Sequence, residues 1–177
     1  IVLILKKDSF TEIPRQSVHK DLKKSQLIIP ITPSFFSIFM TENKPRRKLA
    51  AILAADVVNF SMMMGEDEDR TLKNLKACRA LTDESITANH GRVFGSAGDS
   101  IIAEFASPVD AVVAATEFQR NLRLRNEGIA EKDRMLFRVG LNLGDVIVEG
   151  ENLYGDGVNV AARLEALAEP GGISLSG

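Results

Sequence analysis

Two aspartates, Asp56 and Asp99, stand where a carboxylate is unfavourable unless something binds it. Asp56 ends the apolar run LAAILAAD, and Asp99 lies in the turn VFGSAGDS between two apolar segments. A carboxylate at the end of a buried strand loses hydration unless it is paired, hydrogen-bonded or bound to a cation. If the two strands are neighbours, the carboxylates meet at one edge, where Mg²⁺ or Mn²⁺ would offset their repulsion. The spacing therefore predicts a metal site. The simpler alternatives are a cap formed by Asp56 and a turn formed by Asp99.

The segment that follows Asp56, VVNFSMMM, could supply the second part of such a site. Backbone N–H groups of Asn59, Phe60 and Ser61, close to a helix start, could bind phosphate oxygens. A metal ion beside a phosphate-binding segment is the least that an active site needs for chemistry on a nucleoside triphosphate. Asn159 and Arg163 are four residues apart and share one face of a predicted helix. That spacing alone is equally typical of a polar pair on a surface helix.

The order of apolar runs and turn residues predicts the elements that must position these groups. A run rich in small and branched residues predicts a buried strand over 49–57. The alternation in LFRVGLNLGDVIVEG predicts two strands that turn near Gly144 and Asp145. The remaining predicted elements are a helix over 67–89, a hairpin of 92–94 and 100–105, helices over 108–125 and 156–168, and a strand over 173–175.

Two-stranded units that alternate with helices are typical of an α+β fold. We expect an antiparallel sheet with helices packed on one face, close to a ferredoxin-like core. The pair Ser107-Pro108 is typical of a helix start. We expect the helix that follows it to bury six residues: Val109, Val112, Val113, Ala115, Phe118 and Leu122.

Composition narrows the class of protein. The chain has 177 residues, of which 45% are hydrophobic and 26% charged, and this predicts one soluble domain with a core. The net charge of −2 gives no reason to expect nucleic acid or an anionic membrane as a partner. The apolar runs are shorter than the roughly 20 residues of a membrane helix. The single cysteine, Cys78, excludes an internal disulfide framework and suits the reducing cytoplasm. One cysteine and two histidines in the whole sequence are too few ligands for a structural zinc site.

The two ends of the sequence differ from its middle. The first 39 residues contain IVLIL and IIPITPSFFSIF without sustained periodicity, and the first methionine is Met40. We expect translation to begin at Met40, with residues 1–47 outside the domain. The alternative is an N-terminal extension that packs on the domain or binds a partner. The strand predicted over 173–175 has no cover, so we expect residues 48–177 to be a domain that is incomplete at its C-terminus.

Four segments taken together resemble successive motifs of the class III nucleotidyl cyclase catalytic domain in its bacterial form. They are ILAADVVNFS, GSAGDSIIAEF, GLNLGDVIVEG and YGDGVNVAARLEALAEPGGI. The resemblance runs from about Lys48 to Gly177 and implies the nucleotidyl cyclase fold. It also implies a head-to-tail homodimer with active sites at the interface and two Mg²⁺ or Mn²⁺ ions in each site. The implied reaction is attack of the ribose 3′-hydroxyl on the α-phosphorus, which releases a cyclic nucleotide and pyrophosphate for intracellular signalling.

Single residues match the family's motifs. Asp56 and Asp99 match its two metal-binding aspartates, and the backbone at Val57 would help to hold the metal. Asn159 matches the asparagine that orients the ribose, and Arg163 matches the arginine that stabilises the pentavalent phosphorus. Both of these would come from the other protomer. The resemblance also implies that the backbone of Asn59, Phe60 and Ser61 binds the triphosphate.

The residues expected to bind the base depart from the family's pattern. Gly95 stands where adenylyl members carry a lysine that donates to adenine N1, and Asn152 stands where they carry an acid. Gly95 has no side chain to donate, whereas Asn152 can accept from the adenine amino group or donate to guanine O6. We therefore expect weakened base discrimination, with ATP as the leading substrate and GTP as an alternative.

Three other classes of protein share some of these sequence features. A catalytically weak or regulatory nucleotide-binding domain fits Gly95 and Asn152. A ferredoxin-like interaction module would leave Asp56 and Asp99 unexplained. The absence of a Gly-Gly-Asp/Glu-Glu-Phe signature argues against a diguanylate cyclase.

Overall fold

The computed structural model describes residues 2–6, 9–13, 29–30 and 46–177. Contacts within the chain divide it into two units, Ile1–Lys44 and Pro45–Gly177. In the first unit, β1 (Val2–Lys6) pairs antiparallel with β2 (Ser9–Ile13) and with the two-residue β3 (Ile29–Pro30). The expectation that translation begins at Met40 concerns a position outside the described residues.

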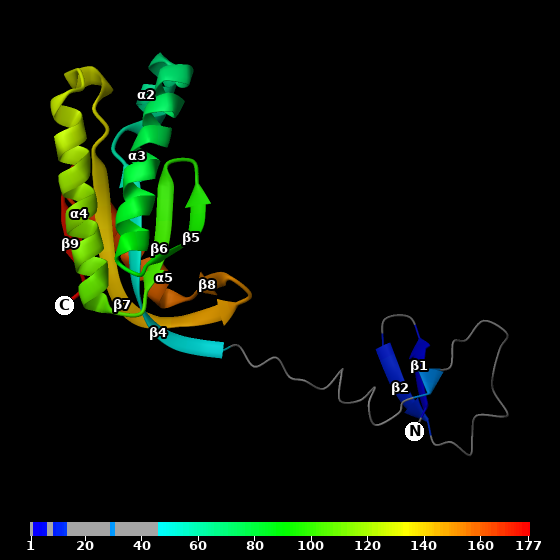
Figure 1. Cartoon of the computed structure of the whole chain (residues 1–177). Helices are drawn as coiled ribbons and strands as arrows, with labels where there is room; N and C mark the ends of the chain where they lie inside the picture. Colours follow the sequence, from blue (N-terminus) through cyan, green and yellow to red (C-terminus); the bar gives the residue numbers. More distant parts are fainter. Residues whose placement is uncertain (1, 7–8, 14–28, 31–45) are drawn as a thin grey trace. The chain divides into compact units, whose positions relative to one another are not determined.

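The second unit is built on a six-stranded sheet (Figure 1). Its strands run in the order β5-β6-β4-β7-β8, with antiparallel neighbours, and β9 adds to β7 in parallel. The strands are β4 (Arg46–Val57), β5 (Arg92–Ala97), β6 (Ser100–Phe105), β7 (Phe137–Glu149), β8 (Asn152–Tyr154) and β9 (Ile173–Leu175). The predicted α+β fold with an antiparallel sheet and packed helices is confirmed.

Strand β7 differs from the prediction of two strands that turn near Gly144 and Asp145. It continues through both residues, which pair with Ala50 and Leu49 of β4. Gly144 serves close packing rather than a turn, because a Cβ atom there would lie 3.1 Å from the Cα atom of Gly157. The chain reverses later, at Gly150, whose φ of 60° suits glycine.

Two long helices, α3 (Glu68–Ala88) and α4 (Pro108–Glu127), cover one face of the sheet, and the short α2 (Phe60–Glu66) precedes them. Ser107 caps α4 by accepting a hydrogen bond from the N–H of Asp110, as its position before proline predicts. The predicted burial of Ala115, Phe118 and Leu122 is confirmed, whereas the predicted burial of the three valines is wrong. Val109, Val112 and Val113 are 67%, 43% and 41% exposed. The buried stripe consists mainly of small residues, which allow the helix to approach the sheet: Ala111, Ala114, Ala115, Phe118 and Leu122.

The last helix, α5 (Asp156–Leu167), packs against the opposite face of the sheet. Its buried Ala161 belongs to a second core cluster with Ala50, Ile52 and Ala54, the residues of β4 that alternate with those facing α3 and α4. The expectation that the helices share one face is therefore corrected for α5. Burial on both sides explains why β4 has a continuous apolar run instead of an alternating pattern.

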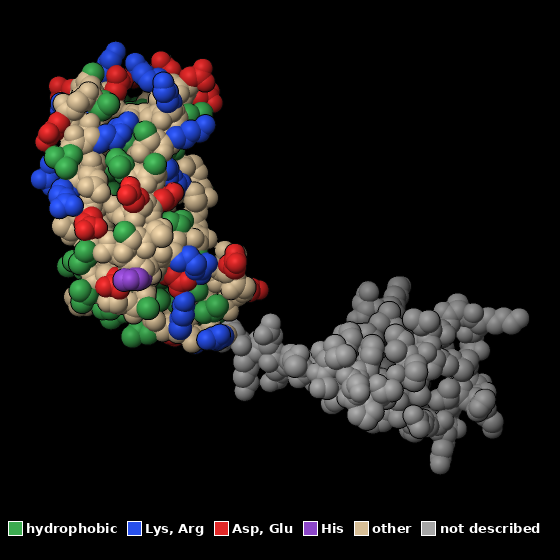
Figure 2. Space-filling model, viewed as in Figure 1, with side chains coloured by type: hydrophobic (Ala, Val, Ile, Leu, Met, Phe, Trp, Pro, Cys, Tyr) green, Lys and Arg blue, Asp and Glu red, His purple; other side chains and the backbone are tan. Residues whose placement is uncertain are grey.

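The surface of the second unit mixes charge types. Figure 2 shows basic and acidic side chains interspersed over the visible face, with hydrophobic side chains between them. Within the part of the chain that the structure describes, no helix has the length and apolar character needed to cross a bilayer.

Candidate active site

Asp56 and Asp99 meet at one end of the sheet, as their positions in the sequence predict. Asp56 lies near the end of β4, and Asp99 lies in the turn that leads into the neighbouring β6. The backbone N–H of Val57 donates to Asp99 Oδ2 at 3.1 Å, and Ser100 Oγ donates to Asp56 Oδ1 at 3.0 Å. Each carboxylate is thus oriented by a residue next to the other one in sequence.

The turn that carries Asp99 is also hydrogen-bonded to helix α3. Arg79 of α3 donates from one guanidinium nitrogen to the carbonyl oxygen of Ser100 at 3.0 Å and to that of Gly98 at 3.4 Å. The same nitrogen contacts Ser96 Oγ. Gly98 adopts φ 61°, which allows the tight turn. The position of Asp99 is therefore set by α3 as well as by β4.

The two carboxylates raise the cost of ionisation at this end of the sheet. Burial, followed by the hydrogen bond and charge of Asp56, raises the pKa of Asp99 from 3.8 to about 6. Burial also raises the pKa of Glu165 on α5, and the charges of Asp56 and Asp99 act in the same direction, whereas Arg138 opposes them. A bound divalent cation would relieve this concentration of negative charge.

Oxygen donors of this kind fit Mg²⁺ or Mn²⁺. Among the described residues there is no group of three or more His, Cys, Asp or Glu side chains arranged to hold a metal. The two aspartates therefore offer part of a coordination shell, as is usual for Mg²⁺, which takes one or two carboxylates and completes its shell with water and substrate phosphates.

Arg138 is a functional candidate that the sequence interpretation missed. It pairs with Asp56 across the β4–β7 ladder, and its Nε atom is buried without a hydrogen-bond partner in the described structure. A guanidinium N–H held in this way beside carboxylates can donate to an anionic group. The signal was present in FRVG, where one charged residue interrupts a buried strand.

The segment predicted to bind phosphate begins directly after β4. Asn59 adopts the left-handed conformation with φ 58°, and its carbonyl accepts from Met62 and Met63 at 3.0 and 3.2 Å. Its side chain does not cap α2. The N–H groups of Phe60 and Ser61 lie in the first turn, where a helix supplies no acceptors of its own.

Asn159 and Arg163 share an exposed face of α5. Residues two apart on a helix lie on nearly opposite sides, so both point away from the face on which Ala161 is buried against the sheet. Within one protomer they are therefore not directed at the face of the sheet that carries Asp56.

The structure brings together the two strands that carry Gly95 and Asn152. Gly95 lies in β5, and the exposed Asn152 begins β8. These are the first and last strands in the order of the sheet, yet they contact each other. A Cβ atom at Gly95 would lie 3.4 Å from the side chain of Ile102, an ordinary contact. The position therefore has room for a side chain.

Comparisons with known proteins agree with this architecture. The family described as the adenylate and guanylate cyclase catalytic domain matches residues 42–177. A relative from Rhizobium meliloti (strain 1021), named "Putative adenylate cyclase 3", is 45% identical over 138 residues, which are 77% of this chain and 24% of the relative. The chain thus spans about a quarter of the length of that curated relative.

Solved structures give the same result. The adenylate/guanylate cyclase/hydrolase from Silicibacter pomeroyi is 39% identical with a TM-score of 0.70, over 75% of this chain and 78% of that one. The guanylyl cyclase Cya2 shares the fold at 23% identity and a TM-score of 0.67, over 75% and 76% of the two chains. The match over residues 42–177 and the fold together assign the chain to the adenylate and guanylate cyclase catalytic domain family.

Proposed function

We propose that the chain converts ATP to cyclic AMP and pyrophosphate, as a homodimer with two active sites at its interface. The observation that carries this proposal is the meeting of Asp56 and Asp99, each oriented by a hydrogen bond from a neighbour of the other. Residues 1–47 are proposed to lie outside the catalytic domain. The cytoplasm is the proposed compartment, because the buried Cys78 is free.

One half of the site comes from the sheet of one protomer. Asp56, Asp99 and the backbone at Val57 would hold two Mg²⁺ or Mn²⁺ ions. When bound, these cations would lower the pKa of the ribose 3′-hydroxyl and offset the charge of the triphosphate. Arg138 and the first N–H groups of α2 donate to phosphate oxygens.

The other half comes from α5 of the second protomer. Asn159 binds the ribose and orients its 3′-hydroxyl towards the α-phosphorus. Arg163 donates to the α-phosphoryl oxygens, where negative charge grows in the transition state. The support for this division is that both side chains point away from the sheet of their own protomer.

ATP is the proposed substrate because of the relative named for adenylate cyclase activity, and the base-binding residues do not decide between ATP and GTP. Gly95 and Asn152 lack the charged pattern expected for adenine. They favour a second candidate function, a nucleotide-binding domain of the same family that turns over slowly.

The test is Mn²⁺-dependent turnover with ATP and with GTP, comparing the wild-type chain with Asp99→Ala. Asp83→Ala, at an exposed position of α3, is the matched control. We expect Asp99→Ala to lose Mn²⁺ binding in calorimetry and at least about a hundredfold in kcat, and the control to retain both. Cyclic product that persists unchanged in Asp99→Ala would contradict the metal assignment. Nucleotide binding without product would favour the second function.

A further inference from the structure

Arg92, the first residue of β5, links three parts of the sheet. Its Nε atom donates to Glu104 Oε1 of β6 at 2.8 Å, and Nη2 contacts the same oxygen. Its Nη1 atom donates to the backbone carbonyl of Glu151 at 2.9 Å, in the turn between β7 and β8. One guanidinium therefore holds the edge strand β5 to the residue that precedes Asn152.

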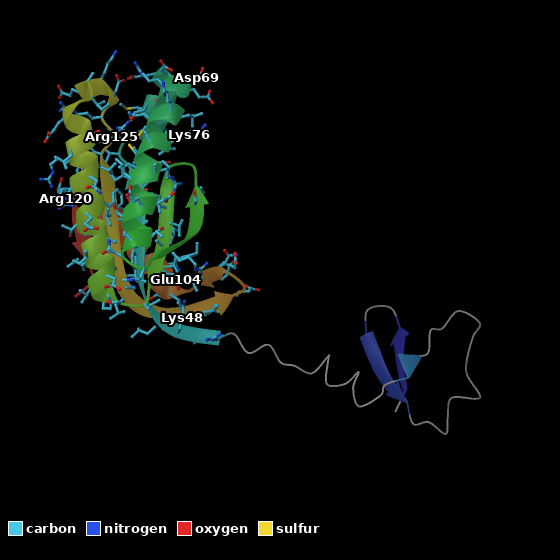
Figure 3. The ribbon with its side chains drawn as sticks, in the orientation of Figure 1. Lys48, Asp69, Lys76, Glu104, Arg120 and Arg125 are labelled. Carbon is cyan, nitrogen blue, oxygen red and sulfur yellow. The ribbon has the colours of Figure 1, made fainter. Side chains whose placement is uncertain are left out.

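Glu104, which accepts from this guanidinium, is buried and contacts two cationic side chains. It is 9% exposed, and its second oxygen contacts Lys48 Nζ of β4. Burial alone would raise the pKa of Glu104, but Lys48 and Arg92 hold it below its usual range, so the carboxylate stays ionised. Figure 3 shows Lys48 and Glu104 at the end of the unit where β7 turns into β8.

The hydrogen bond from Arg92 to Glu151 connects the first strand of the sheet order, β5, to the turn that leads into the last, β8. In the order β5-β6-β4-β7-β8, four strand boundaries separate β5 from β8, yet the two strands are in contact. Apolar residues of both sides fill one core cluster: Phe94 and Ile102 from the hairpin, and Val148 and Leu153 from the other end. Apolar packing does not specify a register between these edges, whereas a directed hydrogen bond does.

We infer that Arg92 is a positioning residue, which fixes the separation of Gly95 and Asn152 and thereby the affinity for the nucleotide base. The inference rests on the proposed function of this site. Gly95 follows Arg92 by three residues, and Asn152 directly follows Glu151. The guanidinium suits this role because its donors form a planar fork that reaches a carboxylate and a carbonyl at once, which a lysine ammonium cannot do in the same geometry.

The effect of Arg92 on the base is separable from the phosphoryl chemistry. Arg92 pairs with Glu104, and Glu104 pairs with Ile52 of β4, which lies four residues before Asp56, or roughly 13 Å along an extended strand. A change at Arg92 therefore leaves the two aspartates and Arg138 in place. We expect loss of Arg92 to weaken nucleotide binding without slowing turnover at saturation.

The experiment compares Arg92→Gln and Arg92→Lys with the wild-type chain, and Arg120→Gln on the exposed face of α4 is the matched control. The readouts are kcat and KM for ATP and GTP with Mn²⁺, the Kd of a fluorescent ATP analogue, and the midpoint of urea unfolding. We expect KM and Kd to rise about tenfold in both Arg92 variants while kcat stays within about twofold. Arg120→Gln should match the wild-type chain.

The lysine variant separates positioning from stability. It keeps a cation beside Glu104, so it should unfold at nearly the wild-type urea midpoint and still show the raised KM. The inference would be overturned if either Arg92 variant kept the wild-type KM and Kd. It would also be overturned if KM alone stayed at the wild-type value in Arg92→Lys. If Arg92→Gln does not fold, Arg92→Lys carries the test alone. A wild-type chain that neither binds nucleotide nor forms product would instead refute the proposed function.

Discussion

The backbone N–H of Val57 donates a 3.1 Å hydrogen bond to the carboxylate of Asp99. This bond ties the turn that carries one aspartate to the strand that carries the other, so the two carboxylates keep their proximity without a cation.

The metal-free chain should lose stability as the pH rises through the range of Asp99. The pKa of Asp99 is raised from 3.8 to about 6 by burial and by Asp56, so the folded chain binds more protons than the unfolded chain between these values. The free energy of unfolding should therefore fall from about pH 4 to about pH 6, by about 1 kcal/mol after allowance for solvent screening. Urea unfolding at several pH values, in the presence of a chelator, measures this.

Asp99→Asn is the control for that pH dependence. It should flatten most of the slope, with a remainder from Glu165, whose pKa is raised by burial and by the same aspartates. A slope that is identical in Asp99→Asn would show that other groups cause it.

Arg138→Met should reduce kcat/KM by about a hundredfold, because it removes a cation that donates to phosphate in the proposed site. Stability should change by less than about 1 kcal/mol, since Arg138 Nε has no hydrogen-bond partner in the described structure. Inhibition by pyrophosphate is the direct readout and should weaken in parallel. Equal inhibition of Arg138→Met and of Arg120→Met would show that Arg138 does not contact the triphosphate.

Two inactive variants should complement each other if each site draws on both protomers. Asp56→Ala removes the sheet half, and Arg163→Ala removes the helix half. In an equimolar mixture, half of the dimers are mixed and each has one intact site, so about a quarter of the wild-type activity should return. Activity of the mixture that stays at the level of the separate variants would place all these residues in one protomer's site.

Gly140→Ala should destabilise the fold by about 2–4 kcal/mol. A Cβ atom at Gly140 would lie 2.1 Å from the carbonyl oxygen of Ala161 and 2.2 Å from the backbone nitrogen of Glu165, so α5 would have to move. Gly65→Ala is the matched control, because nothing lies within 4 Å of its Cβ position. It should stabilise α2 slightly or change nothing, as measured by the urea midpoint. Equal midpoints for the two variants would contradict the close contact.

Gly95→Lys should raise the preference for ATP over GTP, because a lysine can donate to adenine N1. The Cβ position has ordinary contact distance to Ile102, so the substitution should fold. Competition of ATP and GTP for the same enzyme measures the ratio, which should rise about tenfold. An unchanged ratio would remove Gly95 from the base pocket.

The sequence predicted the meeting of Asp56 and Asp99 well, because a strand end and a hairpin turn leave few positions for their side chains. It predicted β7 poorly, because Gly144 and Asp145 are typical turn residues and the close approach of Gly157 is not visible in the local pattern. The buried stripe of α4 was predicted in part: Ala115, Phe118 and Leu122 are buried as expected, whereas the burial of Ala111 and Ala114 in place of the valines was not predicted. Arg138 was overlooked because its partner, Asp56, lies 82 positions earlier in the chain and only the ladder joins them.

Helix α5 carries groups that face two different places. The charges of Asp56 and Asp99 raise the pKa of Glu165, so this side chain lies near them. Arg163, two residues earlier, is exposed and points away from the sheet. In the proposed dimer, the same rigid helix thus borders one active site and completes the other. A nucleotide bound at one site would therefore lie beside the helix whose opposite face serves the twin site.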